Sequence, residues 1–313
     1  MATRAGGEGA QERRAGRAST EYRRGPARRL GYLACVEEST VVVTGCSTGI
    51  GLAVCTLLAR RGHRVVAGVR SDADADRLRA LEPAHIEPVH LDITSDDDIQ
   101  SLACHLADGR RVAALVNNAG IAVPGPIELL ATDEWRRQFE VNVFGTVAVT
   151  RALLPRLLES RGRIVNVSSI SGFVAPPILA PYTASKHALE ALSDALRREL
   201  GSTGVRVVVV EPGDAVTPIW TKGRTDADRR FEEAPDEVQA RYADLVSAVR
   251  ARSETALRRG MPVEEVAEVV LEALTADRPR TRYQVGREAK VLARVRRVLP
   301  DRVMDAVVRR ALR

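Results

Sequence analysis

Short apolar runs recur along the chain and alternate with longer segments in which apolar residues stand three or four positions apart. The runs predict strands, and the segments between them predict helices. Strands that alternate with helices form a parallel sheet with helices on both faces. The predicted fold class is therefore α/β, a Rossmann-type doubly wound parallel sheet in a single domain with a C-terminal helical extension. Six strands are expected, at residues 41–43, 63–70, 89–93, 113–116, 163–169 and 205–210.

One predicted helix is marked by four apolar residues spaced four apart, Trp135, Phe139, Val143 and Val147, which share one face. Asn142 interrupts this segment. A buried amide without hydrogen-bond partners costs about 1–3 kcal/mol. One interpretation of Asn142 is therefore structural, as a side chain bonded to the backbone of a bent helix.

Composition divides the chain into three regions. Residues 1–38 are rich in Arg, Gly and Ala, which predicts a disordered tail. Residues 39–275 carry the alternating pattern and form the predicted catalytic domain. Residues 276–313 contain two short amphipathic helices with arginine-rich polar faces, whose apolar stripes run from Val291 to Leu299 and from Val303 to Leu312. Two interpretations are open for these helices: a pair packed on the domain, or weak peripheral contact of residues 287–313 with a membrane.

Charge is distributed unevenly along the chain. Residues 1–30 carry a net charge of +5 and residues 276–313 one of +8, which leaves −7 for the rest of a chain whose total is +6. An acidic domain between basic ends argues against a nucleic-acid-binding fold. The four cysteines show no metal-ligand spacing, so no metal site is predicted. No apolar run approaches the roughly 20 residues that span a bilayer. We expect a cytoplasmic protein.

The first predicted strand runs directly into a glycine-rich turn, Thr44-Gly45-Cys46-Ser47-Thr48-Gly49-Ile50-Gly51, and a helix follows. Strand, glycine turn and helix in this order are typical of a dinucleotide-binding site. Gly45 permits the tight turn, Gly49 lets the backbone approach a pyrophosphate, and Gly51 allows close packing of helix on strand. The helix N-terminus supplies N–H groups to the phosphates. The alternative is a glycine-rich turn that binds nothing.

The end of the second predicted strand bears on which dinucleotide is bound. In this fold a carboxylate there binds the ribose hydroxyls of NAD, whereas a nearby arginine accepts the 2′-phosphate of NADP. Val69 occupies the position expected for the carboxylate, and Arg70 follows it. The pattern favours NADP(H), with NAD(H) as the alternative; without a ligand, Arg70 would be a solvated strand-end charge. The third predicted strand ends in Asp92 and Ile93, where an acid would meet the adenine.

A tyrosine and a lysine stand four residues apart in the segment Tyr182-Thr183-Ala184-Ser185-Lys186, at the start of an apolar-periodic run. Positions four apart share a helix face, so both side chains can point into one pocket. The ordinary pKa of a tyrosine lies near 10. A fixed cation nearby favours the phenolate and lowers this pKa, which predicts a general acid and base. Such a pair taken alone is usually a surface pair.

Six motifs in order resemble the short-chain dehydrogenase/reductase family, across roughly residues 39–275. They are the T-G-x-x-x-G-x-G turn at 44–51, the N-N-A-G segment at 117–120, Asn142, Ser169, the Y-x-x-x-K pair, and Pro212-Gly213 with Thr217. The turn and the Ala-Gly-Val-Arg end of the second strand are most similar to the steroid and retinol dehydrogenase branch.

The resemblance implies a catalytic set of Asn142, Ser169, Tyr182 and Lys186. Tyr182 would exchange a proton with the substrate oxygen, and Ser169 would hydrogen-bond that substrate. Lys186 would lower the pKa of Tyr182 and bind the nicotinamide ribose, while Asn142 would hold a water that links Lys186 to solvent. The implied cofactor site comprises Thr44, Gly45, Ser47, Thr48, Gly49, Ile50, Gly51, Arg70, Asp92, Ile93, Asn118, Ala119, Gly120, Tyr182, Lys186, Pro212, Gly213, Ala215 and Thr217.

The function predicted is an NADP(H)-dependent oxidoreductase that acts on a carbonyl or secondary alcohol, with an apolar substrate such as a steroid, a retinoid or another ketone. Alternatives are an NAD-dependent alcohol dehydrogenase and a non-catalytic dinucleotide-binding scaffold; the intact catalytic set argues against the scaffold. Residues 214–262 are expected to form the substrate loop, with a polar, mobile lid at 223–230, and the apolar loop 173–181 is a candidate pocket wall. The family resemblance also implies a homo-oligomer, a dimer or a tetramer.

Overall fold

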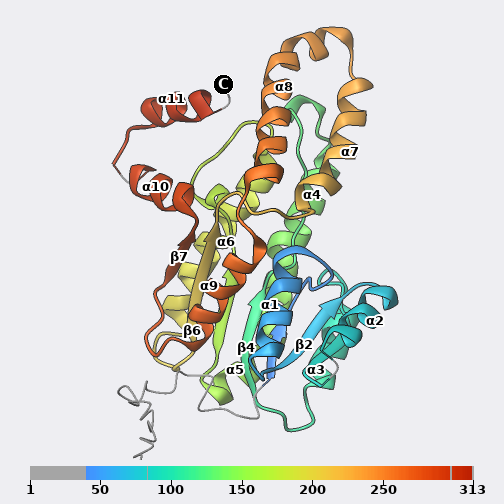
Figure 1. The fold of residues 1–313 in the computed structure, drawn as a ribbon, viewed down its shortest axis with the longest axis vertical. Helices are drawn as coiled ribbons and strands as arrows, with labels where there is room; N and C mark the ends of the chain where they lie inside the picture. Colours follow the sequence, from blue (N-terminus) through green and yellow to red (C-terminus); the bar gives the residue numbers. More distant parts are fainter. Residues whose placement is uncertain (1–39, 83, 297, 312–313) are drawn as a thin grey trace, which may run out of the picture. The chain divides into compact units, whose positions relative to one another are not determined.

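The computed structural model describes residues 40–311 except 83 and 297. The tail predicted at 1–38 and the last residue of the second C-terminal stripe, Leu312, lie outside this part of the chain. In the described part the chain folds into a sheet flanked by helices (Figure 1).

All seven strands of the sheet are parallel, in the order β3-β2-β1-β4-β5-β6-β7. The chain builds outward from β1 to β3 and then crosses over to β4, so the winding direction reverses between β1 and β4. This confirms the predicted doubly wound sheet. The strands are β1 (Thr40–Val43), β2 (Arg64–Val69), β3 (Ile86–His90), β4 (Val112–Asn117), β5 (Arg163–Val167), β6 (Arg206–Pro212) and β7 (Arg282–Val285).

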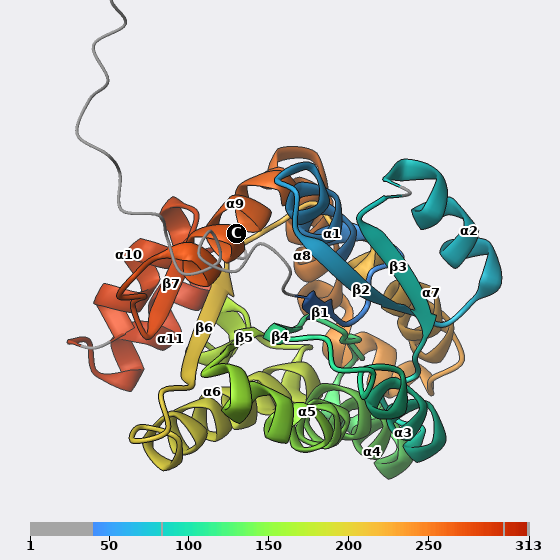
Figure 2. The same ribbon diagram turned by 90° about the horizontal axis from the view of Figure 1, so that it is seen from below.

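Helices cover both faces of the sheet (Figure 2). One face carries α1 (Gly49–Arg60) and α9 (Val263–Thr275), which pack against each other. The other face carries α3 (Asp96–His105), α5 (Thr146–Ser160) and α6 (Ala180–Glu199). The remaining helices are α2 (Asp72–Leu81), α4 (Thr132–Phe139), α7 (Ile219–Glu232), α8 (Asp236–Arg259), α10 (Arg287–Arg296) and α11 (Asp301–Ala311).

The central strands read as unbroken apolar runs because both faces of the sheet are buried. Successive side chains in a strand point to opposite faces. Val41 and Val43 accordingly belong to the core beneath α1 and α9, whereas Val42 belongs to the core beneath α3 and α5. Full burial of such a side chain stabilises the fold by about 1.5–3 kcal/mol.

Two strands differ from the sequence prediction. β3 ends at His90, so Asp92 and Ile93 follow the strand instead of ending it. Leu91 and Ile93 are nevertheless buried in the core beneath α3 and α5, which explains why the apolar pattern continues past the ladder. β7 lies within the region expected to be a helical extension and pairs with β6. The sheet therefore continues beyond residue 275.

The helix predicted around Trp135 is a continuous helical run: α4, a π-helical segment from Glu140 to Gly145, and α5. Its buried side is not the predicted apolar stripe, because Val147 is 38% exposed and its three partners are only half-buried. Near the pocket the buried positions are polar instead, at Gln138, Asn142 and Thr146. They are buried because the backbone of residues 121–123 satisfies the two amides, a pairing that hydrophobic periodicity does not reveal.

By length and composition alone, the run Thr132–Ser160 would be apolar enough to cross a membrane, contrary to the sequence prediction. In the described fold its second half, α5, packs against β4 and α3. Such packing is ordinary for the core helix of a globular protein, and core helices can be as long and as apolar as membrane-spanning ones.

Candidate active site

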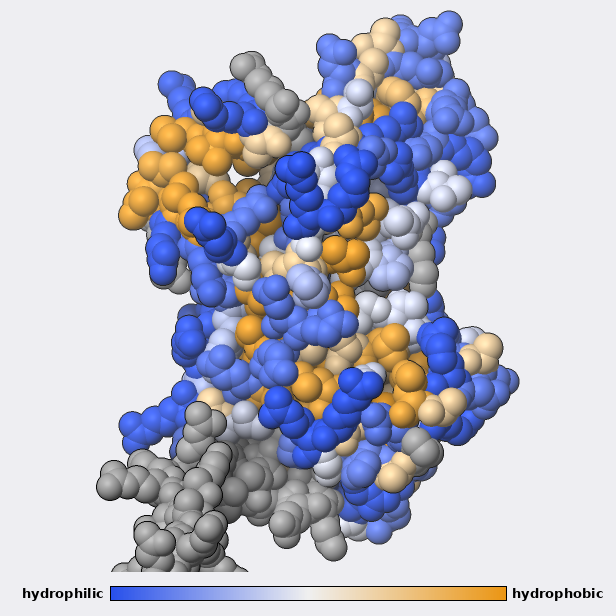
Figure 3. Space-filling model, viewed as in Figure 1, coloured by the Kyte–Doolittle hydropathy of each residue, from blue (hydrophilic) through white to orange (hydrophobic). Residues whose placement is uncertain are grey.

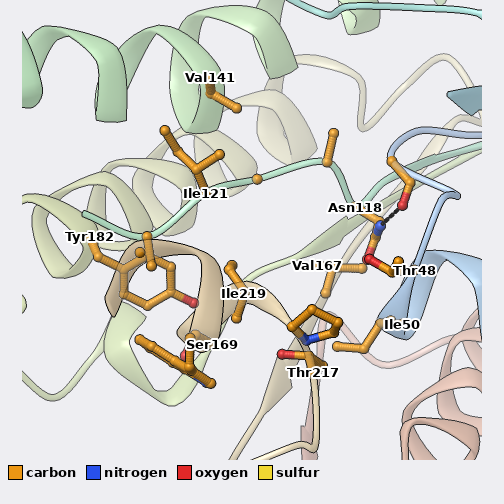
Figure 4. A pocket seen from close by; sticks show the side chains of 18 of the residues that line it. Thr48, Ile50, Asn118, Ile121, Val141, Val167, Ser169, Tyr182, Thr217 and Ile219 are labelled. Atoms are coloured by element: carbon orange, nitrogen blue, oxygen red, sulfur yellow. Dashed lines mark hydrogen bonds between the residues drawn. The ribbon is translucent and has the colours of Figure 1, made fainter. Parts of the chain in front are cut away.

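One pocket opens at the carboxyl ends of the parallel strands, where ligands bind in sheets of this type. Thr48, Ile50 and Asn118 lie toward one end of it, and Tyr182 with Ser169 toward the other (Figure 4). The pocket brings together most of the predicted site: Gly45, Ser47, Thr48, Gly49, Ile50, Arg70, Asp92, Ile93, Asn118, Ala119, Gly120, Ser169, Tyr182, Lys186, Pro212, Gly213, Ala215 and Thr217.

The glycine turn has the geometry that a pyrophosphate requires. Gly45 and Gly49 adopt left-handed conformations, with φ of +71° and +60°. A Cβ on Gly45 would lie 2.7 Å from the Cα of Ala119. Within the described part of the chain, Thr48 makes no side-chain cap to α1, and the first turn of α1 holds no acid. Its N–H groups and helix dipole therefore remain available to an anion, so the residues present fit a dinucleotide phosphate.

Thr44 and Gly51, which the predicted cofactor site included, do not stand on the pocket wall. The Thr44 hydroxyl accepts hydrogen bonds from the backbone N–H groups of Asn118 and Ala119, both at 3.0 Å. The Asn118 amide in turn donates to the carbonyls of Thr44 and Gly45, at 2.9 and 3.1 Å. A Cβ on Gly51 would lie 2.2 Å from the carbonyl oxygen of Gly45. Both residues shape the turn and join it to the loop after β4.

Arg70 and Asp92 both line the pocket. The Arg70 side chain is 66% exposed, and its guanidinium lies 3.9 Å from the Asp92 carboxylate. Burial alone would raise the pKa of Asp92, but hydrogen bonds from Thr94 and the charge of Arg70 together lower it. A second guanidinium, that of Arg77 on α2, donates to the backbone carbonyl of Ser47. Arg77 therefore contacts the glycine turn directly, whereas the sequence prediction included only Arg70.

The polar side chains at the catalytic end of the pocket are buried. Tyr182 and Lys186 occupy successive turns of α6 and are 4% and 6% exposed, and Ser169 is 8% exposed. The Lys186 ammonium donates to the carbonyl of Val167 at 2.8 Å. Ser169 follows β5, where its hydroxyl accepts from the N–H of Ser171. These contacts fix the side chains of Lys186 and Ser169.

Burial sets the pKa of both titratable groups here. It raises the pKa of Tyr182 to about 12, against the opposing hydrogen bond to Ser169. It also lowers the pKa of Lys186 to about 8, against the charge of Glu190. This corrects the expectation that the lysine would dominate and depress the pKa of the tyrosine. The ammonium lies 5.8 Å from the centre of the tyrosine ring, and the pKa of Tyr182 is set by desolvation and by the hydrogen bond with Ser169.

Asn142 does not reach the pocket wall. Its side-chain oxygen accepts from the N–H of Ile121 at 2.9 Å, and its amide donates to the Ile121 carbonyl and to the Ser185 hydroxyl, both at 3.0 Å. The residue sits in the π-helical segment, and such segments occur frequently at functional sites. Its side chain joins the loop after β4 to α6, so its partners are not the helix backbone that the structural interpretation expected.

Several residues that line the pocket were not predicted from the sequence. Ile121, Val141 and Ile219 form apolar parts of the wall around the tyrosine (Figure 4). Trp220 meets the Tyr182 ring edge-on, with ring centres 5.3 Å apart and planes at 71°. The available signal for Trp220 was a large aromatic residue three positions after Thr217. The predicted apolar loop 173–181 is not part of the wall that the structure describes.

The segment predicted as a polar, mobile lid is part of helix α7. This helix approaches the loop after β4 so closely that a Cβ on Gly223 would lie 2.4 Å from the Ala122 carbonyl oxygen. Farther along α7, Arg230 pairs with Glu134 of α4 and donates to the Pro124 carbonyl at 2.8 Å. The charged side chains of Glu134, Arg137, Asp226 and Arg230 line this side of the pocket.

Comparisons with known proteins agree with this geometry. A sequence model of the family described as short chain dehydrogenase matches residues 39–228. NADPH-dependent 3-dehydrocapnine reductase from Ornithobacterium rhinotracheale is 36% identical over 276 residues, which cover 85% of this chain and 94% of that protein. Retinol dehydrogenase 16 from Mus musculus is 34% identical over 282 residues, covering 87% and 88%.

Among solved structures, a short chain dehydrogenase/reductase from Burkholderia phymatum in complex with NAD superimposes with a TM-score of 0.69 and 26% identity. The match covers 82% of this chain and 92% of that one. The family model spans most of the sheet, and the relatives cover most of the chain. This chain belongs to the short-chain dehydrogenase family and is an oxidoreductase of CH–OH and carbonyl groups.

Proposed function

We propose that this oxidoreductase uses NADP(H) to interconvert a carbonyl and a secondary alcohol on a largely apolar substrate. One observation carries the proposal: buried Ser169, Tyr182 and Lys186 share a pocket with a glycine turn that fits a pyrophosphate. A scaffold that only bound the nucleotide would not require a buried tyrosine, serine and lysine at the far end of the same pocket.

The roles of the chain's own residues follow from their environment. The Tyr182 phenol is protonated near neutral pH, since burial raises its pKa, so it can donate its proton to a carbonyl oxygen during reduction. Ser169 hydrogen-bonds the same oxygen. Lys186 supplies a cation beside the phenol, which stabilises the phenolate left behind. When bound, the nicotinamide supplies or accepts the hydride.

An apolar substrate is supported by the wall around the tyrosine. Ile121, Val141, Ile219 and Trp220 present hydrocarbon and aromatic surface to the space beside the phenol. A polar substituent packed against these four side chains would lose hydration without gaining a partner. We therefore favour apolar carbonyl compounds, such as ketosteroids and retinoids, as the substrate class.

The preference for NADP(H) over NAD(H) rests on the positive charge of Arg70, which lines the pocket. Arg70 is largely exposed and lies 3.9 Å from Asp92, so its guanidinium can turn toward a 2′-phosphate. A guanidinium binds phosphate through two charge-assisted hydrogen bonds. Asp92 is the residue that favours the alternative, because a carboxylate would accept from the ribose hydroxyls of NAD.

Transfer of an isotopic label tests the reaction itself. NADPH with deuterium at both C4 positions of the nicotinamide is incubated with the protein and a panel of apolar ketones, and the alcohols are analysed by mass spectrometry. We expect one deuterium per product molecule, at the former carbonyl carbon. Label-free alcohol, or no alcohol from any ketone or aldehyde, would contradict the proposed reaction.

We further propose that the chain is a homo-oligomer. The outer side of the long helical run supports this, since Phe144, Val147 and Leu158 are 57%, 38% and 37% exposed. Apolar surface of this kind is commonly covered by another protein surface. Light scattering after size exclusion should give a dimer or a tetramer, and a monomer at micromolar concentration would refute the proposal.

Peripheral membrane contact through α10 and α11 is a second proposal about partners, for a protein that we continue to expect in the cytoplasm. Orange, apolar surface gathers over these helices (Figure 3), where Val291, Val298 and Val303 are 54%, 77% and 43% exposed. Arginines occupy the same two helices, which suits an anionic lipid surface. Binding to anionic but not neutral liposomes at low salt is expected; no binding to either would exclude this contact.

A further inference from the structure

Carboxylates continue along α6 beyond the catalytic lysine. Glu190 and Asp194 stand one and two turns after Lys186, and both pair with Arg282 of β7. The guanidinium Nε lies 3.0 Å from a Glu190 oxygen, and another of its nitrogens lies 3.0 Å from Asp194. The same Nε lies 3.3 Å from Glu211 of β6. Arg282 thus links the edge strand β7 to the catalytic helix α6.

This arginine does not fully neutralise Glu190. Its Nε is shared between Glu190 and Glu211, and a third carboxylate takes another of its nitrogens. The second oxygen of Glu190, Oε1, is buried and has no hydrogen-bond partner in the part of the chain that the structure describes. The side chain is only 12% exposed. Negative charge therefore remains in a nearly dry environment, one turn from Lys186, where electrostatic interactions are weakly screened.

The position of Glu190 is fixed from two sides. Arg282 holds one carboxylate oxygen, and the backbone at Gly172 closes over the side chain, where a Cβ would lie 2.9 Å from both the Glu190 Cγ and the Ser168 hydroxyl. Residues four apart on a helix can form a direct ion pair. Glu190 instead points to Arg282, and the Lys186 ammonium keeps its bond to the Val167 carbonyl.

We propose that Glu190 is a positioning residue that keeps the Lys186 ammonium charged, and that Arg282 prevents Glu190 from pulling this ammonium away from the substrate side of the pocket. The inference rests on the proposed role of Lys186 in the reaction. It assigns Glu190 of α6 and Arg282 of β7 to the residues that support Lys186.

Electrostatics support the same arrangement. Burial lowers the pKa of Lys186 to about 8, and the charge of Glu190 acts against that loss. The charged groups that face Glu190 are Lys186 and Asp194 on α6, Arg282 on β7 and Glu211 on β6. Tyr182 lies on the far side of Lys186, and the segment 168–172 presents uncharged groups. Without Glu190 the ammonium would lose its proton at a lower pH, and the phenolate would lose its stabilising cation.

The chain contains only three lysines, Lys186, Lys222 and Lys290, which makes a direct test possible. Lysine labelled with carbon-13 at Cε gives three NMR signals, assigned with Lys222→Arg and Lys290→Arg, and each is titrated in the full-length protein. In Glu190→Gln we expect the Lys186 midpoint to fall by about one pH unit. In Glu190→Asp, which keeps the charge, it should stay near the wild-type value.

Asp194→Asn is the matched control, because it removes a carboxylate from the same arginine one turn farther from the lysine. It should lower the melting temperature much as Glu190→Gln does and leave the Lys186 midpoint in place. Arg282→Gln releases Glu190 toward Lys186. The titration midpoint of Lys186 should therefore rise, while turnover falls. The proposal is overturned if the midpoint does not move in Glu190→Gln, or if Asp194→Asn moves it equally. The midpoint measurements need no turnover, so they stand apart from the deuterium experiment.

Discussion

Different interactions stabilise the two sides of the pocket: the nucleotide side, formed by the glycine turn and α1, and the substrate side, formed by α7 and the adjoining α8. On the nucleotide side, α1 buries five of its 12 residues, and the glycine turn is fixed by backbone contacts and by Thr44 and Asn118. On the substrate side, α8 buries only Val238 and Val246 among 24 residues. There the contacts are ion pairs, such as Arg224 with Glu254 and Arg250 with Asp228.

The difference indicates where the site can change. Backbone contacts and a packed core resist displacement, since a clash there has no empty space to relax into. Partly exposed ion pairs each contribute only about 0–1 kcal/mol and can be exchanged. We infer that the nucleotide side is rigid and that the substrate side adapts, with Tyr182 and its neighbours at the junction between them.

The largest effect is expected at that junction. Tyr182→Phe removes the proton donor and leaves the packing against Trp220 in place. Turnover should fall by about 10²- to 10⁴-fold. Cofactor affinity, measured by fluorescence titration, should stay near the wild-type value. Retention of turnover would remove the tyrosine from the mechanism, and loss of cofactor binding would show that the two sides are not separable.

A matched pair of glycine substitutions compares the two sides directly. Gly51→Ala and Gly223→Ala each place a Cβ against a carbonyl oxygen, at 2.2 and 2.4 Å. On the nucleotide side we expect the free energy of unfolding to fall by about 1–3 kcal/mol, together with cofactor affinity. On the substrate side α7 can move outward, so the KM for substrate should change more than stability does. Equal losses of stability in both variants, measured by denaturant unfolding, would contradict the comparison.

Arg70→Asp tests the specificity of the nucleotide side. It replaces the proposed phosphate ligand with a carboxylate, which repels a 2′-phosphate. A hydrogen bond to a charged group contributes about 1.5–3 kcal/mol. The ratio of NADPH to NADH affinity should therefore fall by about 10- to 100-fold. Arg77→Gln, which alters the arginine bonded to the Ser47 carbonyl, should change this affinity ratio less. An unchanged ratio in Arg70→Asp would exclude the strand-end arginine as the selector.

The smallest effect is expected from the ion pair between α7 and α4. Glu134→Gln weakens its contact with Arg230 beside the pocket. The KM for substrate should rise a few-fold, consistent with about 0.2–1 kcal/mol, and kcat should hardly change. Glu128→Gln is the control, because its pair with Arg241 is more exposed and does not line the pocket. A larger effect from the control would place the important contact elsewhere.

The same contrast explains what the sequence could predict. The turn at 44–51 and the Tyr182–Lys186 pair depend on local backbone geometry, which residue type and spacing express directly. The doubly wound sheet followed from strands that alternate with helical segments. The short edge strand β7 was missed because its burial alternates over four residues next to a turn.

Other features depend on tertiary contacts that have no local signature. Gln138 and Asn142 are buried because the loop at Ile121 bonds to them, so the apolar stripe at Val147 faces outward. The pKa of Tyr182 rises because α6 is buried, whereas spacing alone suggested a decrease. Trp220 reaches the tyrosine through the course of α7, and the ion pairs of α7 and α8 join residues far apart in the chain.

The central claim is that a rigid nucleotide side selects NADP(H) for hydride transfer. Titration of the wild-type protein with NADPH and with NADH, followed by cofactor fluorescence, tests it most directly. We predict saturable binding of both cofactors, with NADPH at least about tenfold tighter, which corresponds to about 1.4 kcal/mol. Tighter binding of NADH would contradict the assignment of Arg70, and binding of neither would contradict the proposed dinucleotide site.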